Sequence, residues 1–126
     1  MFANLEWFKD QAERQYQLVP VGDVKVRVQS LTVLEQAEVT AAALEHAKTG
    51  DKVDTPKFAR RQLIVMVAKS IVDDKGVRVF QDTDEHYAIV EQMRSKSGKA
   101  LEDAVRALSM PDNEATETKN SPAVPG

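Results

Sequence analysis

The chain has 126 residues, 42% of them hydrophobic and 29% charged, so it can bury one modest hydrophobic core but not two independent ones. Its formal net charge of −3 argues against a protein whose affinity depends on neutralising many nucleic-acid phosphates, and no segment approaches the roughly 18 apolar residues of a membrane span. Cysteine is absent, which excludes disulfides, thiolate metal sites and a cysteine nucleophile.

Residues 2–16 predict a short amphipathic helix, because apolar side chains recur there at spacings of three and four residues. These side chains are Leu5, Phe8, Ala12 and Tyr16. Trp7 lies beside Phe8, and one helical face cannot hold both rings at its centre. Aromatic residues are enriched in interface hot spots, so Trp7 and Phe8 are candidate partner-binding residues. The alternative is that both rings pack against the segment that follows.

Residues 17–29 predict a β-hairpin. From Val24 to Gln29, valines alternate with polar residues, which is typical of a strand with one buried face. Gly22-Asp23 forms a two-residue connection, and glycine at its first position suits a type II′ turn. Pro20 cannot donate a backbone hydrogen bond, so the first strand is expected at the edge of the sheet.

Residues 33–48 predict a second helix, because Thr32 and Glu35 have the spacing of a capping box immediately before it and Gly50 marks its end. Its apolar face is expected to consist of Leu34, Ala37, Ala41 and Leu44. A polar loop, 49–54, follows.

Residues 57–72 form the most apolar predicted helix and our candidate for the centre of the fold. Thr55 is expected to be its N-cap, with Pro56 at the first helical position, where the missing N–H costs nothing. The apolar face expected to be buried contains Leu63, Val67 and Ile71.

Two further helices are predicted towards the C-terminus. Residues 77–80 are expected to form a short extended piece that packs back on the core. Asp82 and Glu85 then open a helix that includes Met93, and Ser97 caps a last helix. We therefore predict a mainly α (α+β) fold, with one domain over residues 1–110 and a flexible polar tail over 111–126.

The sequence offers few groups for catalysis. His46 and His86 are the two histidines, and neither lies near a nucleophile in a familiar motif. Asp82, Asp84 and His86 are a conceivable divalent-ion site, but helix capping and favourable charge in the first helical turn explain the same acidic residues. Glycine motifs for nucleotide binding are absent. The sequence therefore predicts no enzyme activity, cofactor or metal.

Basic residues form two clusters, one at the start of the third helix and one around the last turn. The first contains Lys57, Arg60 and Arg61, and the second contains Arg94, Lys96 and Lys99. A solvated surface is the default interpretation. Among functional interpretations an acidic protein partner is favoured, which makes the first cluster, with Trp7 and Phe8, the candidate partner-binding set. The net negative charge disfavours a DNA-binding regulator.

Three stretches resemble the tail assembly chaperones of long-tailed phages. They are VKVRVQSLTVLEQAEV, ARRQLIVMVAKSIVDDKGVRVFQDTDEHYAIVEQM and GKALEDAVRALSMPDN, within residues 18–113. The first resembles the family's valine-rich strand running into a helix start. The second resembles its apolar helix, DDKG turn and acidic-capped helix, and the third its final helix. The chain lacks a cysteine that relatives often carry near the end of the central helix.

The resemblance implies a chaperone that binds the tape measure protein, delivers it to the tail tube protein and works in the host cytoplasm. Self-association is a further candidate contact, and the charge and hydropathy predict no nucleic-acid or membrane partner. The acidic N-terminal segment, unlike a signal peptide, fits that location. The runner-up is a structural virion component, such as a head-tail joining or tail-completion protein. A small enzyme is a third class, for which the sequence shows no polar pocket.

Overall fold

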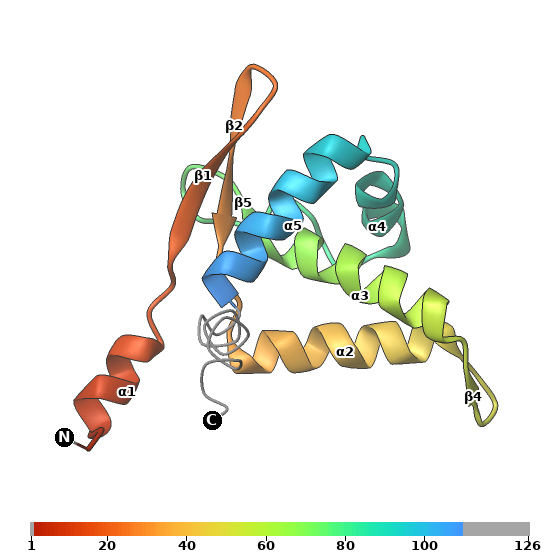
Figure 1. The fold of residues 1–126 in the computed structure, drawn as a ribbon, viewed down its shortest axis with the longest axis horizontal. Coiled ribbons are helices and arrows are strands. Elements are labelled where there is room, and N and C mark those ends of the chain that lie inside the picture. The colour runs from red at the N-terminus through yellow and green to blue at the C-terminus, as the bar shows by residue number, and fades with distance from the viewer. Residues whose placement is uncertain (1, 110–126) are drawn as a thin grey trace, which may run out of the picture.

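Residues 2–109, which the computed structural model describes, fold around one central helix, α3 (Thr55–Ser70). Helices pack against α3 from several sides, and a three-stranded sheet lies along the body (Figure 1). The predicted mainly helical α+β class with a small N-terminal hairpin is confirmed. The predicted tail, 111–126, lies outside the described residues.

The N-terminal helix is shorter than predicted. α1 (Leu5–Gln11) begins after Asn4, whose side-chain oxygen accepts a hydrogen bond from the Trp7 N–H at 3.0 Å. The helix predicted over 2–16 is wrong at its C-terminal end, because Tyr16 belongs to the first strand. No residue of α1 is buried, and α1 projects away from the body (Figure 1).

β1 (Tyr16–Val21) and β2 (Val24–Gln29) form the predicted hairpin, with β1 at the sheet edge. Gly22 has a φ of +64°, as the first central residue of a type II′ turn requires. A third strand, β5 (Ile71–Val72), pairs with the other edge of β2 and was not predicted. The third helix, predicted over 57–72, ends at Ser70, and the next two residues pair with β2 instead.

α2 (Val33–Ala47) begins with the predicted capping box between Thr32 and Glu35. However, the face that it packs into the body is not the predicted apolar face. The buried residues are Val39, Ala43 and Ala47, whose small side chains allow a close approach to α3. The predicted apolar face, formed by Leu34, Ala37, Ala41 and Leu44, is exposed.

The connection between α2 and α3 is more regular than the predicted polar loop. β3 (Lys48–Thr49) and β4 (Lys52–Val53) form a two-stranded ribbon. The N-cap of α3 is Asp54 and not Thr55, because the Asp54 carboxylate accepts from the backbone N–H of the residue three positions later, at 3.0 Å. Pro56 therefore takes the second helical position, still within the first turn.

The last two helices also start at residues other than the predicted ones. α4 (Asp84–Glu91) is capped by Thr83 and not Asp82, whose carboxylate binds other side chains. α5 (Ser95–Ser109) begins two residues before the predicted cap, Ser97, which lies in its first turn. Both differences are shifts of one or two residues among neighbouring residues that can cap a helix.

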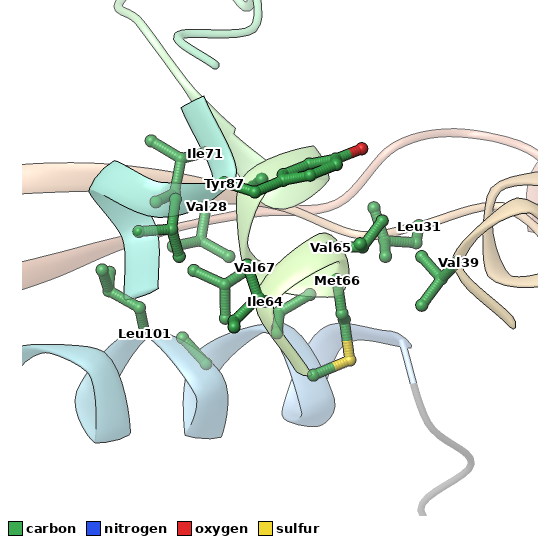
Figure 2. Close-up of a cluster of buried hydrophobic side chains, with 14 of the residues drawn as sticks. Val28, Leu31, Val39, Ile64, Val65, Met66, Val67, Ile71, Tyr87 and Leu101 are labelled. Carbon is green, nitrogen blue, oxygen red and sulfur yellow. The ribbon is translucent and has the colours of Figure 1, made fainter. Parts of the chain in front are cut away.

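The core is built around α3, which is buried on all sides over its second half, residues 64–70. This confirms the prediction that α3 is central. Figure 2 shows its side chains meeting those of the sheet and the other helices. Residues of the core outside α3 are Val19, Val28, Leu31, Val39, Ile71, Tyr87, Val90, Leu101, Ala104 and Val105.

The segment between α1 and β1 is tied to the start of α2. Arg14 makes a two-pronged ion pair with Glu35, with Nη2 to Oε2 at 2.8 Å, and also donates to the Ser30 carbonyl at 2.7 Å. The backbone N–H of Gln15 donates to the Ser30 hydroxyl at 2.9 Å. These bonds hold the position at which α1 leaves the body.

Replacing Glu35 by glutamine should cost about 2 kcal/mol at pH 7, because it removes a charge-assisted hydrogen bond and part of a capping box. Hydrogen bonds from Arg14, supported by the Thr32 backbone, lower the pKa of Glu35 to about 2. The carboxylate's stabilisation is therefore complete above its ordinary pKa of 4.5 and is lost as the pH falls towards 2. Urea unfolding of the unaltered chain and the Glu35→Gln chain should be measured from pH 7 to pH 2.5. The difference between their free energies of unfolding should narrow as the pH falls below 4.5. A difference that stays constant would contradict the role of the Arg14–Glu35 pair.

Candidate functional site

An apolar groove of about 440 Å³ lies between α3, α4 and the start of α5. Its apolar lining comes from α3, α4 and the turn between α4 and α5, and consists of Leu63, Ile64, Val67, Val90 and Met93, whereas α5 contributes polar and charged residues and a glycine. Since these residues continue directly into the buried core, the groove is a place where the core reaches the surface. Such apolar grooves between helices are typical docking sites for an amphipathic helix.

Leu63 is the residue whose position differs most from its predicted role. The sequence predicts Leu63, Val67 and Ile71 as one buried face, but Leu63 is partly exposed and lines the groove. Val67 is buried, and Ile71 is buried on β5 and not on the helix. Leu63 therefore joins the core to a surface on which a partner can bind.

The two basic clusters of the sequence meet at this groove from opposite sides. Arg60 on α3 and Lys99 on α5 both line it. Lys57 lies one helical turn before Arg60, while Arg94 and Lys96 flank Ser95, which also lines the groove. Of these five cations, Arg60 and Lys99 line the groove, and we call these two residues the basic rim.

The cations of the two basic clusters differ in whether they form ion pairs. Within residues 2–109, the side chains of Lys57, Arg60, Arg94 and Lys96 make no ion pair. Lys99 pairs with Asp103 at 3.0 Å. Two acidic residues also line the groove, and one of them, Glu102, is already paired with Arg106 at 2.8 Å. Among the charged residues that line the groove, Arg60 and Glu91 make no ion pair within residues 2–109, so the unpaired charge of the lining is balanced.

Arg61, the third member of the predicted cluster, is turned into the body. Its side chain is 13% exposed, its Nη2 lies 2.9 Å from Nδ1 of His46, and its guanidinium lies 5.2 Å from the centre of the Tyr87 ring. Desolvation and the adjacent Arg61 cation lower the pKa of His46, which favours a neutral ring that accepts this hydrogen bond. Arg61 thus joins α2, α3 and α4 and is not presented to a partner.

The aromatic pair on α1 is presented to solvent. Trp7 is 50% exposed and Phe8 is 58% exposed, and their rings meet edge to face with centroids 5.0 Å apart. The alternative in which both rings pack against the hairpin is wrong, since no residue of α1 is buried. Leu5 in the same helix is also exposed, so α1 presents three large apolar side chains to solvent in the described structure.

A wider hollow of about 870 Å³ lies beside the hairpin, lined partly by β1, β2 and α5. One of its charged groups, the Arg27 guanidinium, is engaged within the chain: it lies 4.1 Å from the centre of the Tyr16 ring and donates to the Asp74 carbonyl at 3.1 Å. Neither basic cluster and neither ring of the α1 pair lines it. The groove between α3, α4 and α5 is therefore the stronger candidate site.

The conceivable metal ligands do not form a site in the described part of the chain. No group of three His, Asp or Glu residues within 2–109 is placed to hold a metal ion. Asp82 accepts hydrogen bonds from Arg78 and Tyr87, and the His86 ring accepts from the Gln81 N–H at 2.7 Å. Among the same residues, no helix is long and apolar enough to cross a membrane.

Sequence reasoning identified both sets of groove cations but not the groove. Its one available signal was that each basic cluster borders an apolar segment, Leu63 to Val67 in one case and Val90 to Met93 in the other. Comparison with known protein families, curated proteins and solved structures finds no match to this chain.

Proposed function

We propose that this chain is a tail assembly chaperone of a long-tailed phage, which binds helical segments of the tape measure protein in the host cytoplasm and delivers them to the tail tube protein. The observation that supports this proposal best is the apolar groove with its basic rim. The resemblance of the sequence to this chaperone family supplies the identity of the partner.

The groove suits a helix whose apolar face would otherwise aggregate. Leu63 and Met93 are partly exposed in it, and docking of a helix would remove them from water. A long helical chain with exposed apolar faces is an aggregation hazard until it is enclosed. Binding by burial alone requires neither a nucleotide nor a metal.

Co-expression with the tape measure protein should raise that protein's soluble fraction, and Leu63→Ala should weaken capture about tenfold, as expected for an interface hot spot. Leu44→Ala is the matched control, because Leu44 is also partly exposed but lies on α2 outside the groove. Loss of capture with Leu44→Ala alone would move the binding surface to α2. No co-purification with the unaltered chain would contradict the proposal.

A second experiment separates the runner-up, a structural virion component. A chaperone should be absent from purified finished particles, whereas a head-tail joining or tail-completion protein should remain in them. Immunoblotting of particles with an antibody against the chain distinguishes the two functions, and a band at stoichiometric level would favour the structural protein.

A further inference from the structure

The outer edge of β1 carries backbone groups that point away from the sheet. β1 pairs with β2 on one side and is the edge strand on the other. The Gln15 carbonyl accepts from the Ser30 N–H at 2.8 Å, so the odd-numbered residues of β1 direct their backbone groups towards β2. Tyr16, Leu18 and Pro20 therefore direct theirs outward. No backbone carbonyl among residues 2–109 accepts from the Tyr16 or Leu18 N–H.

This edge is accessible and lacks the charges that commonly protect edge strands from pairing. Residues 15–21, QYQLVPV, contain no charged side chain. Gln17 and Leu18, which point to opposite faces of the sheet, are both exposed, and Leu18 is 58% exposed. α1 lies beyond the start of β1 and not alongside it (Figure 1). The edge can therefore be approached by another strand.

The opposite edge of the sheet is already closed. β5 is two residues long, and Val72 forms a bridge with Arg78 on the side away from β2. The Asp73 N–H next to it donates to the Val77 carbonyl at 2.8 Å. Extension of the sheet is thus restricted to β1, and two copies that meet there leave no further edge for growth.

We propose that β1 of one copy pairs with β1 of a second copy in an antiparallel, two-fold arrangement centred on Leu18. The Leu18 N–H of each copy donates to the carbonyl of the partner's Leu18. The Tyr16 N–H donates to the carbonyl of the partner's Pro20, which needs no acceptor in return because proline has no N–H. Every outward N–H of both strands is then bonded, and two sheets of three strands become one of six.

The length of β1 selects this register. Centred on Leu18, the two strands pair over residues 16–20, which includes every outward-facing residue of β1. A pair centred on Gln17 would place Pro20 opposite Arg14, which lies outside the strand and is bound to Glu35. The proposed register therefore gives the longest paired stretch.

A second copy suits this edge better than the other available occupants. The tail, 111–126, contains three prolines and the polar run DNEATETKNS, which lacks the composition of a strand. A helical partner offers no extended backbone. In the two-fold pair no charges lie directly opposite each other, and Lys25 and Arg27 on β2 are three strand spacings from their counterparts, about 14 Å. That distance exceeds the screening length of about 8 Å at physiological ionic strength.

The pair leaves the groove between α3, α4 and α5 free, because no residue of β1 lines it. Each dimer then carries two grooves. On the proposed function, on which this consequence alone rests, one dimer holds two segments of the same long helical chain and binds it more tightly than one copy does.

Sedimentation velocity of the purified full chain over a concentration series tests the inference. The unaltered chain should dimerise, and Leu18→Pro should weaken dimerisation at least about tenfold, because it removes two of the four proposed hydrogen bonds. The Leu18 N–H takes no part in the pairing of β1 with β2, so the hairpin should remain, which circular dichroism checks. Leu18→Ala, which keeps the N–H, should weaken dimerisation less than Leu18→Pro.

A charge exchange identifies the two-fold axis. Leu18→Lys and Leu18→Glu should each weaken dimerisation, because two like charges face each other, whereas an equal mixture of the two chains should form a mixed dimer. Val24→Lys and Val24→Glu are the matched controls, since Val24 is also 58% exposed but lies on β2. Neither control should change dimerisation.

Amide hydrogen exchange measured by NMR identifies the bonded groups. The Tyr16 and Leu18 amides should become protected as the protein concentration rises. Protection of these amides in a chain that stays monomeric would place another segment of the same chain at the edge and overturn the inference. Monomers at all concentrations, or a mixture of the Lys and Glu variants without mixed dimers, would also overturn it. These measurements use the chain alone, so their failure is distinguishable from failure to capture the tape measure protein.

Discussion

Replacing Leu101 by alanine should lower the free energy of unfolding by about 2–5 kcal/mol, the range for a leucine truncated in a closed core. Leu101 lies on α5, is 2% exposed and belongs to the largest fully buried side chains of the described structure. Figure 2 shows it in the cluster around α3, to which Val67 and Val28 also belong. Its truncation leaves a cavity that the rigid elements around it fill only partly.

Urea unfolding followed by circular dichroism measures this loss at constant m-value. Leu34→Ala is the matched control, because Leu34 is 67% exposed and the same truncation there should change stability by less than about 0.5 kcal/mol. Equal effects at the two positions would mean that α5 does not pack on α3 as described.

Replacing Asp82 by alanine should cost about 2 kcal/mol, because one carboxylate serves three side chains while solvent screens part of the interaction. It accepts two hydrogen bonds from Arg78, at 2.9 and 3.0 Å, and one from the Tyr87 hydroxyl at 3.0 Å. It also lies 3.4 Å from Nζ of Lys69, whose side chain is only 8% exposed. Removal of Asp82 would leave these groups with fewer partners.

The control for this prediction lies two residues further along the chain. Asp84 is 97% exposed and its one ion pair, with Arg61, is 3.7 Å long, so Asp84→Ala should change the free energy of unfolding by less than about 0.5 kcal/mol. Hydrogen bonds from Arg78 hold the pKa of Asp82 well below its ordinary value. The loss of unfolding free energy caused by Asp82→Ala should therefore be largest at neutral pH and become smaller on strong acidification. A neutral effect at pH 7 would contradict this account.

Lys69 shows why a buried charge is tolerated at this position. Its ammonium lies on the central helix between two carboxylates from other elements, Glu38 at 3.3 Å and Asp82 at 3.4 Å. Gln29, also buried, donates to the Lys69 carbonyl at 3.0 Å. These polar contacts connect α2, the sheet and the segment before α4 around α3, so the charge is paired where it is buried.

Tertiary packing places the neighbouring basic residues of α3 in different surroundings. Sequence alone placed Lys57, Arg60 and Arg61 together, because they lie within five residues of one helix. Packing then turned Arg61 inward, where His46 and Tyr87 contact it, and left Arg60 beside the groove. Side chains one residue apart on a helix point about 100° apart, so adjacent cations can have different roles.

The sequence by itself determined the features that depend on residues close together in the chain. The capping box of Thr32 and Glu35, the turn at Gly22 and the edge position of β1 required only short-range chemistry. The central position of α3 followed from the uninterrupted apolar run over residues 63–68 in its second half, because a helical segment that is apolar on all sides is stable only when it is surrounded.

Only the tertiary structure decided which of two apolar stripes α2 buries. Leu34 and Leu44 mark one stripe, and Val39 and Ala43 mark the other, and both have helical spacing. The second is buried because its small side chains let α2 approach α3 closely. The groove is likewise a product of tertiary packing. No sequence pattern records that α3, α4 and α5 separate at Leu63, because that gap depends on how three helices pack and not on any one of them.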